Sequence, residues 1–127
     1  MLNNSKSELE KAYGYLIYKE NIKAIKVLSK FIKNNSLNYN AWVYLGIAKR
    51  RIHAYEEAIA CFKTASKLNK SIIDAWGLLA ITYLDQGKID MAQKILEKAA
   101  KFNQFNPIFQ FLYLNLIQLW RKDGPFF

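Results

Sequence analysis

The sequence predicts an all-α protein, a solenoid of helical hairpins that repeat at a fixed interval along the chain. The first observation is a constant spacing of 34 between residues of the same kind: Trp42 and Trp76, Leu45 and Leu79, Ala58 and Ala92, and Ala65 and Ala99. The second is that small residues recur where two packed helices must approach closely. The third is that five Gly and two Pro in 127 residues leave room for long helices. A fixed period of this length indicates stacked hairpins, here seven helices.

Composition places the whole chain, residues 1–127, in one domain. The hydrophobic share of 52% is ample for a continuous core. Residues 1–10 lack the apolar run of a secretory signal, and the most apolar window, 108–120, is shorter than the roughly 20 residues of a membrane span. A single cysteine, Cys61, excludes an internal disulfide. We therefore expect a cytoplasmic protein.

The first hairpin is expected over residues 5–38. Its first helix, about 5–18, starts at Ser5 or Ser7 as a cap and buries Leu9, Ala12 and Leu16 only if the register of the repeat shifts by one. Its second helix, about 21–33, returns to strict register. A run of turn-forming residues at 34–36 then ends the hairpin.

The later hairpins are expected over residues 39–72 and 73–106. The turn inside the second lies near 52–54, and the third can start at Ser71 or Asp74. Gly87 falls in the turn inside the third, where a left-handed backbone suits glycine. Asn106 and Pro107 are good first residues for a closing helix over 107–122, followed by an apolar tail at 123–127.

The motif of the repeat points to a family. Trp42-x2-Leu45-Gly46 followed by Ala58-x3-Phe62-x2-Ala65 resembles the tetratricopeptide repeat, most specifically in the middle two hairpins. The resemblance implies a right-handed superhelical array in which the first helix of each hairpin lines a concave groove. It also implies a closing helix such as 107–122.

The resemblance, carried over in register, implies a set of groove residues: Tyr13, Asn40, Val43, Tyr44, Ile47, Arg50, Leu78, Ile81, Phe111 and Asn115. This largely apolar and aromatic lining predicts an adaptor or chaperone-like module that binds a hydrophobic peptide or helix of a partner protein. The alternative is that Ile47, Leu78 and Ile81 only pack between helices. The acidic tail of heat-shock chaperones, held by some members of the family, is not expected, because Tyr13, Tyr44 and Asp74 replace the required cations and amides.

Charge suggests a second possibility. Nineteen Lys and Arg against ten Asp and Glu leave a net charge of +9, and Lys30, Lys67 and Lys98 belong to rows on the second helices, the convex face in the family's geometry. A lysine face can simply keep the protein in solution. The functional alternative is an electrostatic binder of anionic membrane or nucleic acid. Nucleic acid is disfavoured because only three residues are Arg and the basic rows lack interleaved aromatics; a membrane surface is open but less favoured.

Catalysis finds little support. The only histidine, His53, falls in a predicted turn and has no obvious carboxylate or nucleophile beside it. No phosphate-binding glycine loop and no metal-ligand spacing of Cys and His are present. We therefore expect no enzymatic activity, no cofactor and no metal.

The closing helix is more apolar than one packing contact requires. We expect a homodimer or a second docking site around an apolar set at the C-terminal end: Phe111, Leu114, Trp120, Phe126 and Phe127. The alternative is that the tail folds back and covers this surface within one chain.

Overall fold

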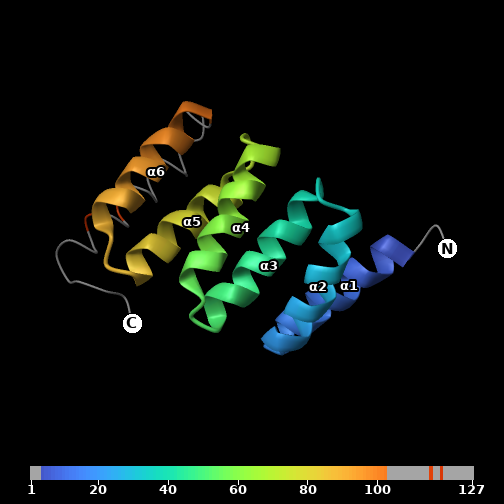
Figure 1. Cartoon of the computed structure of the whole chain (residues 1–127). Helices are drawn as coiled ribbons and strands as arrows, with labels where there is room; N and C mark the ends of the chain where they lie inside the picture. The colour runs from blue at the N-terminus through green and yellow to red at the C-terminus, as the bar shows by residue number, and fades with distance from the viewer. Residues whose placement is uncertain (1–3, 103–114, 116–117, 119–127) are drawn as a thin grey trace.

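The computed structural model describes residues 4–102 together with Asn115 and Gln118, and this part of the chain is helical without any strand. Its six helices are α1 (Asn4–Ile17), α2 (Asn21–Asn34), α3 (Tyr39–Arg51), α4 (Tyr55–Leu68), α5 (Ile73–Asp85) and α6 (Ile89–Phe102). In Figure 1 they follow one another across the molecule from α1 at the right to α6 at the upper left, each packed against the helix before it. The predicted all-α solenoid is confirmed.

The sequence predicts seven helices where the structure describes six. The expected closing helix at 107–122 and the tail at 123–127 lie outside the described residues, apart from two positions. Those two, Asn115 and Gln118, have helical backbone and are exposed.

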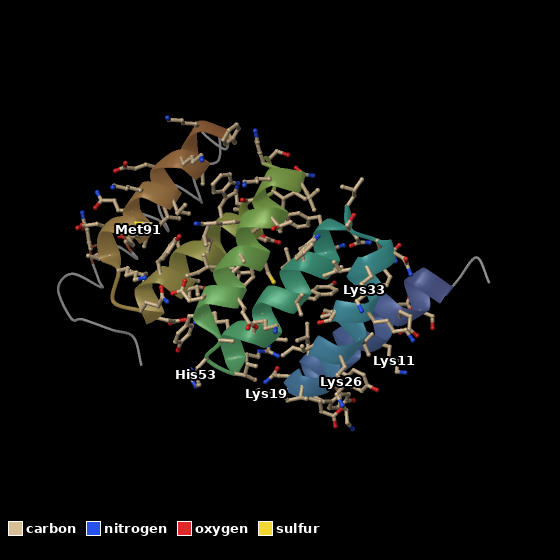
Figure 2. All side chains as sticks on the ribbon, in the orientation of Figure 1. Lys11, Lys19, Lys26, Lys33, His53 and Met91 are labelled. Atoms are coloured by element: carbon tan, nitrogen blue, oxygen red, sulfur yellow. The ribbon has the colours of Figure 1, made fainter. Side chains whose placement is uncertain are left out.

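The turn inside each hairpin has one left-handed residue at the same position of the repeat. Lys19, His53 and Gly87 have φ values of 58°, 63° and 75°. The next amide in each case donates to the carbonyl five residues earlier, at 2.8 to 2.9 Å. This bond satisfies a carbonyl of the preceding helix. The sequence predicts a left-handed residue only at Gly87. The other two turns adopt the same conformation with larger side chains, those of Lys19 and His53, which lie at the lower side of the molecule in Figure 2.

The repeated tryptophans do more than fill space. The indole Nε1 of Trp42 donates to the carbonyl of Ser36 at 2.8 Å, and that of Trp76 donates to the carbonyl of Lys70 at 3.0 Å. Both acceptors lie six residues upstream, in the turn between hairpins. Each tryptophan therefore ties its own helix to the turn that leads into it.

The small residues of the repeat lie where helices meet. Ala58 and Ala92 are fully buried, as are Ala24 and Ala65. Gly46 faces the ring of Phe62, and a Cβ at Gly46 would lie 2.7 Å from Cδ1 and 2.8 Å from Cζ of that ring. In the first hairpin Ala12 and Leu16 are buried, as the shifted register predicts.

The predicted cap of the first helix is wrong. Ser5 and Ser7 lie inside α1, which begins at Asn4. The residue before α5 is Ile72, whose side chain cannot form a capping hydrogen bond. A tertiary contact replaces the cap: the Tyr39 hydroxyl of α3 accepts from the Ala75 amide at 3.1 Å. One of the unpaired amides of the first turn is thereby satisfied from the neighbouring hairpin.

Candidate functional site

A shallow aromatic cavity lies between the first helices of hairpins one and two. Its volume is about 300 Å³, and its lining comes from α1 and α3: Leu9, Glu10, Tyr13 and Tyr44. The rings of Tyr13 and Tyr44 are 5.6 Å apart at an interplanar angle of 44°. Tyr13 is 51% exposed, so a large apolar surface remains open to a ligand. Burial raises the pKa of Tyr44 above 10.0, and the neighbouring Tyr13 adds to the increase, so the Tyr44 phenol stays neutral at physiological pH.

Hydrogen bonds fix the first helices of hairpins two and three side by side. Arg50 of α3 donates to the Asp85 carboxylate of α5 from Nε at 2.6 Å and from Nη2 at 3.3 Å. Such a two-pronged pair restricts both distance and orientation. The Tyr39 hydroxyl bond to α5 lies near the other end of the same pair of helices. The pKa of Tyr39 is raised overall: burial and the nearby Asp74 raise it by more than the hydrogen bond from the Ala75 amide lowers it. The hydroxyl therefore remains protonated at physiological pH.

Several of the predicted groove residues lie on α1, α3 and α5, the first helices of the three hairpins. Tyr13 and Tyr44 form the cavity, and Asn40 is exposed at the start of α3. Ile47 and Leu78 are partly buried and pack against the hydrophobic core, and Ile81 is also partly buried. Ile47 and Leu78 therefore have a packing role, whether or not they also meet a ligand.

Two predicted groove residues have structural roles. Val43 is only 7% exposed and packs with Ala65 and Ala75 between hairpins, so it offers almost no surface to a ligand. The next residue along α3, Tyr44, lines the cavity. Arg50 was expected to orient a ligand, but its guanidinium is paired with Asp85.

The C-terminal predictions fall largely beyond the described part of the chain. Phe111, Leu114, Trp120, Phe126 and Phe127 all lie outside the described residues, so self-association stays a prediction. Asn115 is described, and it is helical and exposed.

Groups suited to catalysis or metal binding are sparse over the described residues. His53 is exposed, and its Nδ1 lies 2.7 Å from the Tyr55 hydroxyl. In residues 4–102, 115 and 118, no group of three or more His, Cys, Asp or Glu side chains is placed to hold a metal. Cys61 is buried, and burial raises the pKa of its thiol to about 11, which suppresses thiolate reactivity. Within the same residues, no helix is long and apolar enough to cross a bilayer.

A second cavity, on the second helices, was missed from the sequence. It has a volume of about 560 Å³ and is lined from α4, the turn after it, α5 and α6: Lys63, Ser66, Lys67, Lys70, Trp76, Leu79, Ile95, Lys98 and Phe102. Lys67 and Lys98 were expected on the convex face, but their proximity to an aromatic pair was not. The register of the repeat could have predicted this cavity, because it places Trp76 beside the second helix of its own hairpin, α6, and that of the hairpin before, α4.

Known proteins share the repeat of this chain. The tetratricopeptide repeat family matches residues 51–113. A curated relative, Tetratricopeptide repeat protein 37 of Xenopus laevis, is 30% identical over 106 residues, which is 84% of this chain. The chain belongs to the tetratricopeptide-repeat family.

This tetratricopeptide-repeat chain spans only a small part of the length of the curated relatives that it matches; for the Xenopus protein the share is 6%. Among solved structures, the type III secretion chaperone SycD of Yersinia enterocolitica, in complex with a peptide of the translocator YopD, has a TM-score of 0.79 at 17% identity. The likeness covers 91% of this chain and 93% of that one. The first tetratricopeptide repeat domain of Spaghetti (RPAP3), bound to the HSP90 peptide SRMEEVD, has a TM-score of 0.79 at 18% identity and covers 95% of both chains. At these identities the likeness establishes the fold.

Proposed function

We propose that this tetratricopeptide-repeat chain is a non-catalytic protein-interaction module whose concave groove binds an apolar peptide or amphipathic helix of a partner protein. The observation that carries the proposal is the open cavity between α1 and α3, in which the Tyr13 and Tyr44 rings lie 5.6 Å apart. Paired tyrosines supply large contact area at low conformational cost, which is why such residues dominate binding energy at interfaces. We expect it to act in the cytoplasm.

The chemistry of the cavity favours an apolar occupant. Among the described residues, no basic side chain lines the cavity, and the charged residue of its lining is Glu10. A peptide rich in carboxylates would meet Glu10 and two phenols rather than cations. The two peptide-bound neighbours support peptide binding by this fold, and the lining argues for an apolar ligand rather than an acidic one.

Rigidity of the groove supports the same proposal. The Arg50–Asp85 pair and the Tyr39 hydroxyl bond hold α3 against α5, and Arg51 Nη1 donates to the Leu16 carbonyl of α1 at 2.7 Å. A groove whose walls are already fixed loses little conformational entropy when a ligand binds.

The test is a peptide-display selection on the intact chain, followed by affinity measurements with the peptides it yields. The double variant Tyr13→Ala, Tyr44→Ala should weaken binding by about 2 kcal/mol, a roughly 30-fold rise in Kd. A matched control removes two equally apolar residues elsewhere, Tyr18→Ala and Leu37→Ala, which are 80% and 81% exposed. This control should change Kd by less than about twofold.

Two results would reject the groove proposal. One is equal affinity for the wild type and the tyrosine variant while circular dichroism shows both folded. The other is an equal loss in the control variant, which would indicate non-specific apolar adhesion. Leu78→Glu is a poorer probe, because Leu78 packs against the core and a buried charge there would perturb the fold itself.

A further inference from the structure

The cavity between α4 and α6 combines an apolar floor with a basic rim. Trp76 and Leu79 are 4% and 1% exposed and form the floor with Ile95. Four lysines from three separate segments surround it: Lys63 and Lys67 from α4, Lys70 from the following turn and Lys98 from α6. No acidic side chain of the described part of the chain lines this cavity. None of the four lysines forms an ion pair with the described carboxylates.

The cluster of four lysines occurs at the contact region between α4 and α6, which is called a seam here, and it does not recur with the repeat. The equivalent seam, between α2 and α4, lies one repeat upstream. There Ser29, Lys33, Ser36 and Thr64 occupy the positions of Lys63, Lys67, Lys70 and Lys98. A lysine face that only keeps the protein in solution would be spread over both seams. Like charges gathered around one apolar recess instead favour an anionic ligand.

The aromatic pair in the cavity is already occupied on the faces that a nucleic-acid base would use. Phe102 is stacked on Trp76 with centroids 6.0 Å apart and an interplanar angle of 17°. The Lys70 ammonium lies 5.5 Å from the centroid of the Phe102 ring, a cation–π contact. A stacking base would have to displace one of these partners. A flat membrane surface could reach the lysines but not the recessed floor.

We propose that this cavity is a second docking site, which binds an acidic peptide segment of a partner protein that carries one apolar anchor residue. The anchor enters the recess against Leu79, Ile95 and the edge of Phe102, and carboxylates on either side of it pair with the rim lysines. The cavity volume of about 560 Å³ lies within the range of ordinary ligand pockets. This site differs from the concave groove in ligand charge and in the helices that form it.

The experiment measures fluorescence anisotropy of a labelled peptide, acetyl-EDEFEDE-amide, with the intact protein at low and physiological salt. A second peptide, EDEGEDE, keeps the charge and removes the anchor. The variant pair Lys67→Glu, Lys98→Glu reverses the rim charge, and Lys67→Gln, Lys98→Gln neutralises it with less risk to the fold. The matched control is Lys26→Glu, Lys33→Glu on α2 (Figure 2), which makes the same charge change away from the cavity, Lys33 being the repeat equivalent of Lys67.

The proposal expects EDEFEDE to bind at least about fivefold more tightly than EDEGEDE, and the glutamate pair to lose at least about tenfold in affinity. The glutamine pair should lose an intermediate amount and the α2 control less than about threefold. Four results would overturn the proposal: no measurable binding of EDEFEDE, equal affinity for both peptides, or equal losses in the cavity and control variants. The fourth is tighter, cavity-dependent binding of oligouridylate or of vesicles made of phosphatidylserine and phosphatidylcholine in equal parts.

Discussion

Gly46 and Phe62 form a size-matched pair, and the equivalent positions of the third hairpin hold a larger and a smaller residue. A Cβ at Gly46 would lie 2.7 and 2.8 Å from two ring atoms of Phe62, which is fully buried. The equivalent positions one repeat later hold Ala80 and Leu96, both buried. The larger residue on the first helix is therefore accompanied by a smaller one on the second.

The perturbation is Gly46→Ala. Overpacking a well-filled core costs about 1–3 kcal/mol, and alanine regains about 1 kcal/mol over glycine in a helix interior. We expect a net loss of up to about 2 kcal/mol, and each kcal/mol lowers the Tm by roughly 4 °C in a chain of this size. Phe62→Leu alone should also destabilise the protein, because it leaves unfilled volume beside Gly46.

The double variant Gly46→Ala, Phe62→Leu tests the reasoning, since it reproduces the pair found in the third hairpin. Its loss of unfolding free energy should be at least about 1 kcal/mol smaller than the sum of the two single losses. Urea unfolding of all four proteins, followed by circular dichroism, measures this coupling. Single losses that add to within about 0.3 kcal/mol would refute the idea that these two residues compensate each other.

Two further predictions concern the backbone and the buried thiol. Gly87→Ala should cost about 1 kcal/mol because Gly87 has φ of 75°, whereas Gly77→Ala in α5 should stabilise by up to about 1 kcal/mol; neither new Cβ would meet any atom within 4 Å. Thermal unfolding measures both, and shifts of the same sign would contradict the backbone argument. For Cys61, burial raises the folded pKa from 9.0 to about 11, so the stability contributed by the neutral thiol is complete below pH 9 and is lost as pH rises to 11. Relative to Cys61→Ala, the wild type should lose up to about 2 kcal/mol between pH 8 and 11 in urea unfolding; parallel pH profiles would show that burial of this thiol does not matter.

The hairpins could be predicted from the sequence because their determinants are local. Alanines at 24, 58 and 92 mark close helix approach, and all three are fully buried. Helix formation and the register of the repeat each depend on residues within one hairpin. The all-α solenoid follows from these local rules alone.

The contacts between hairpins could not be predicted in the same way. The Arg50–Asp85 pair joins residues 35 apart and the Tyr39–Ala75 bond joins residues 36 apart. These offsets depend on how far each hairpin is displaced and rotated against the next, which no single repeat encodes. The same limit hid the basic cavity, since its lysines belong to three segments and its aromatic pair to α5 and to the end of α6.

The two proposed sites can be tested independently because the described helices form a sequential array. Each helix packs against the next along the chain, and the further contacts join α1 to α3 and α3 to α5. The groove cavity is lined by α1 and α3, while the basic cavity is lined by α4, α5, α6 and the turn between α4 and α5. In such an array a substitution acts mainly through nearest neighbours. The tyrosine variants should therefore leave EDEFEDE binding unchanged and the lysine variants should leave groove binding unchanged, so that failure of one proposal says nothing against the other.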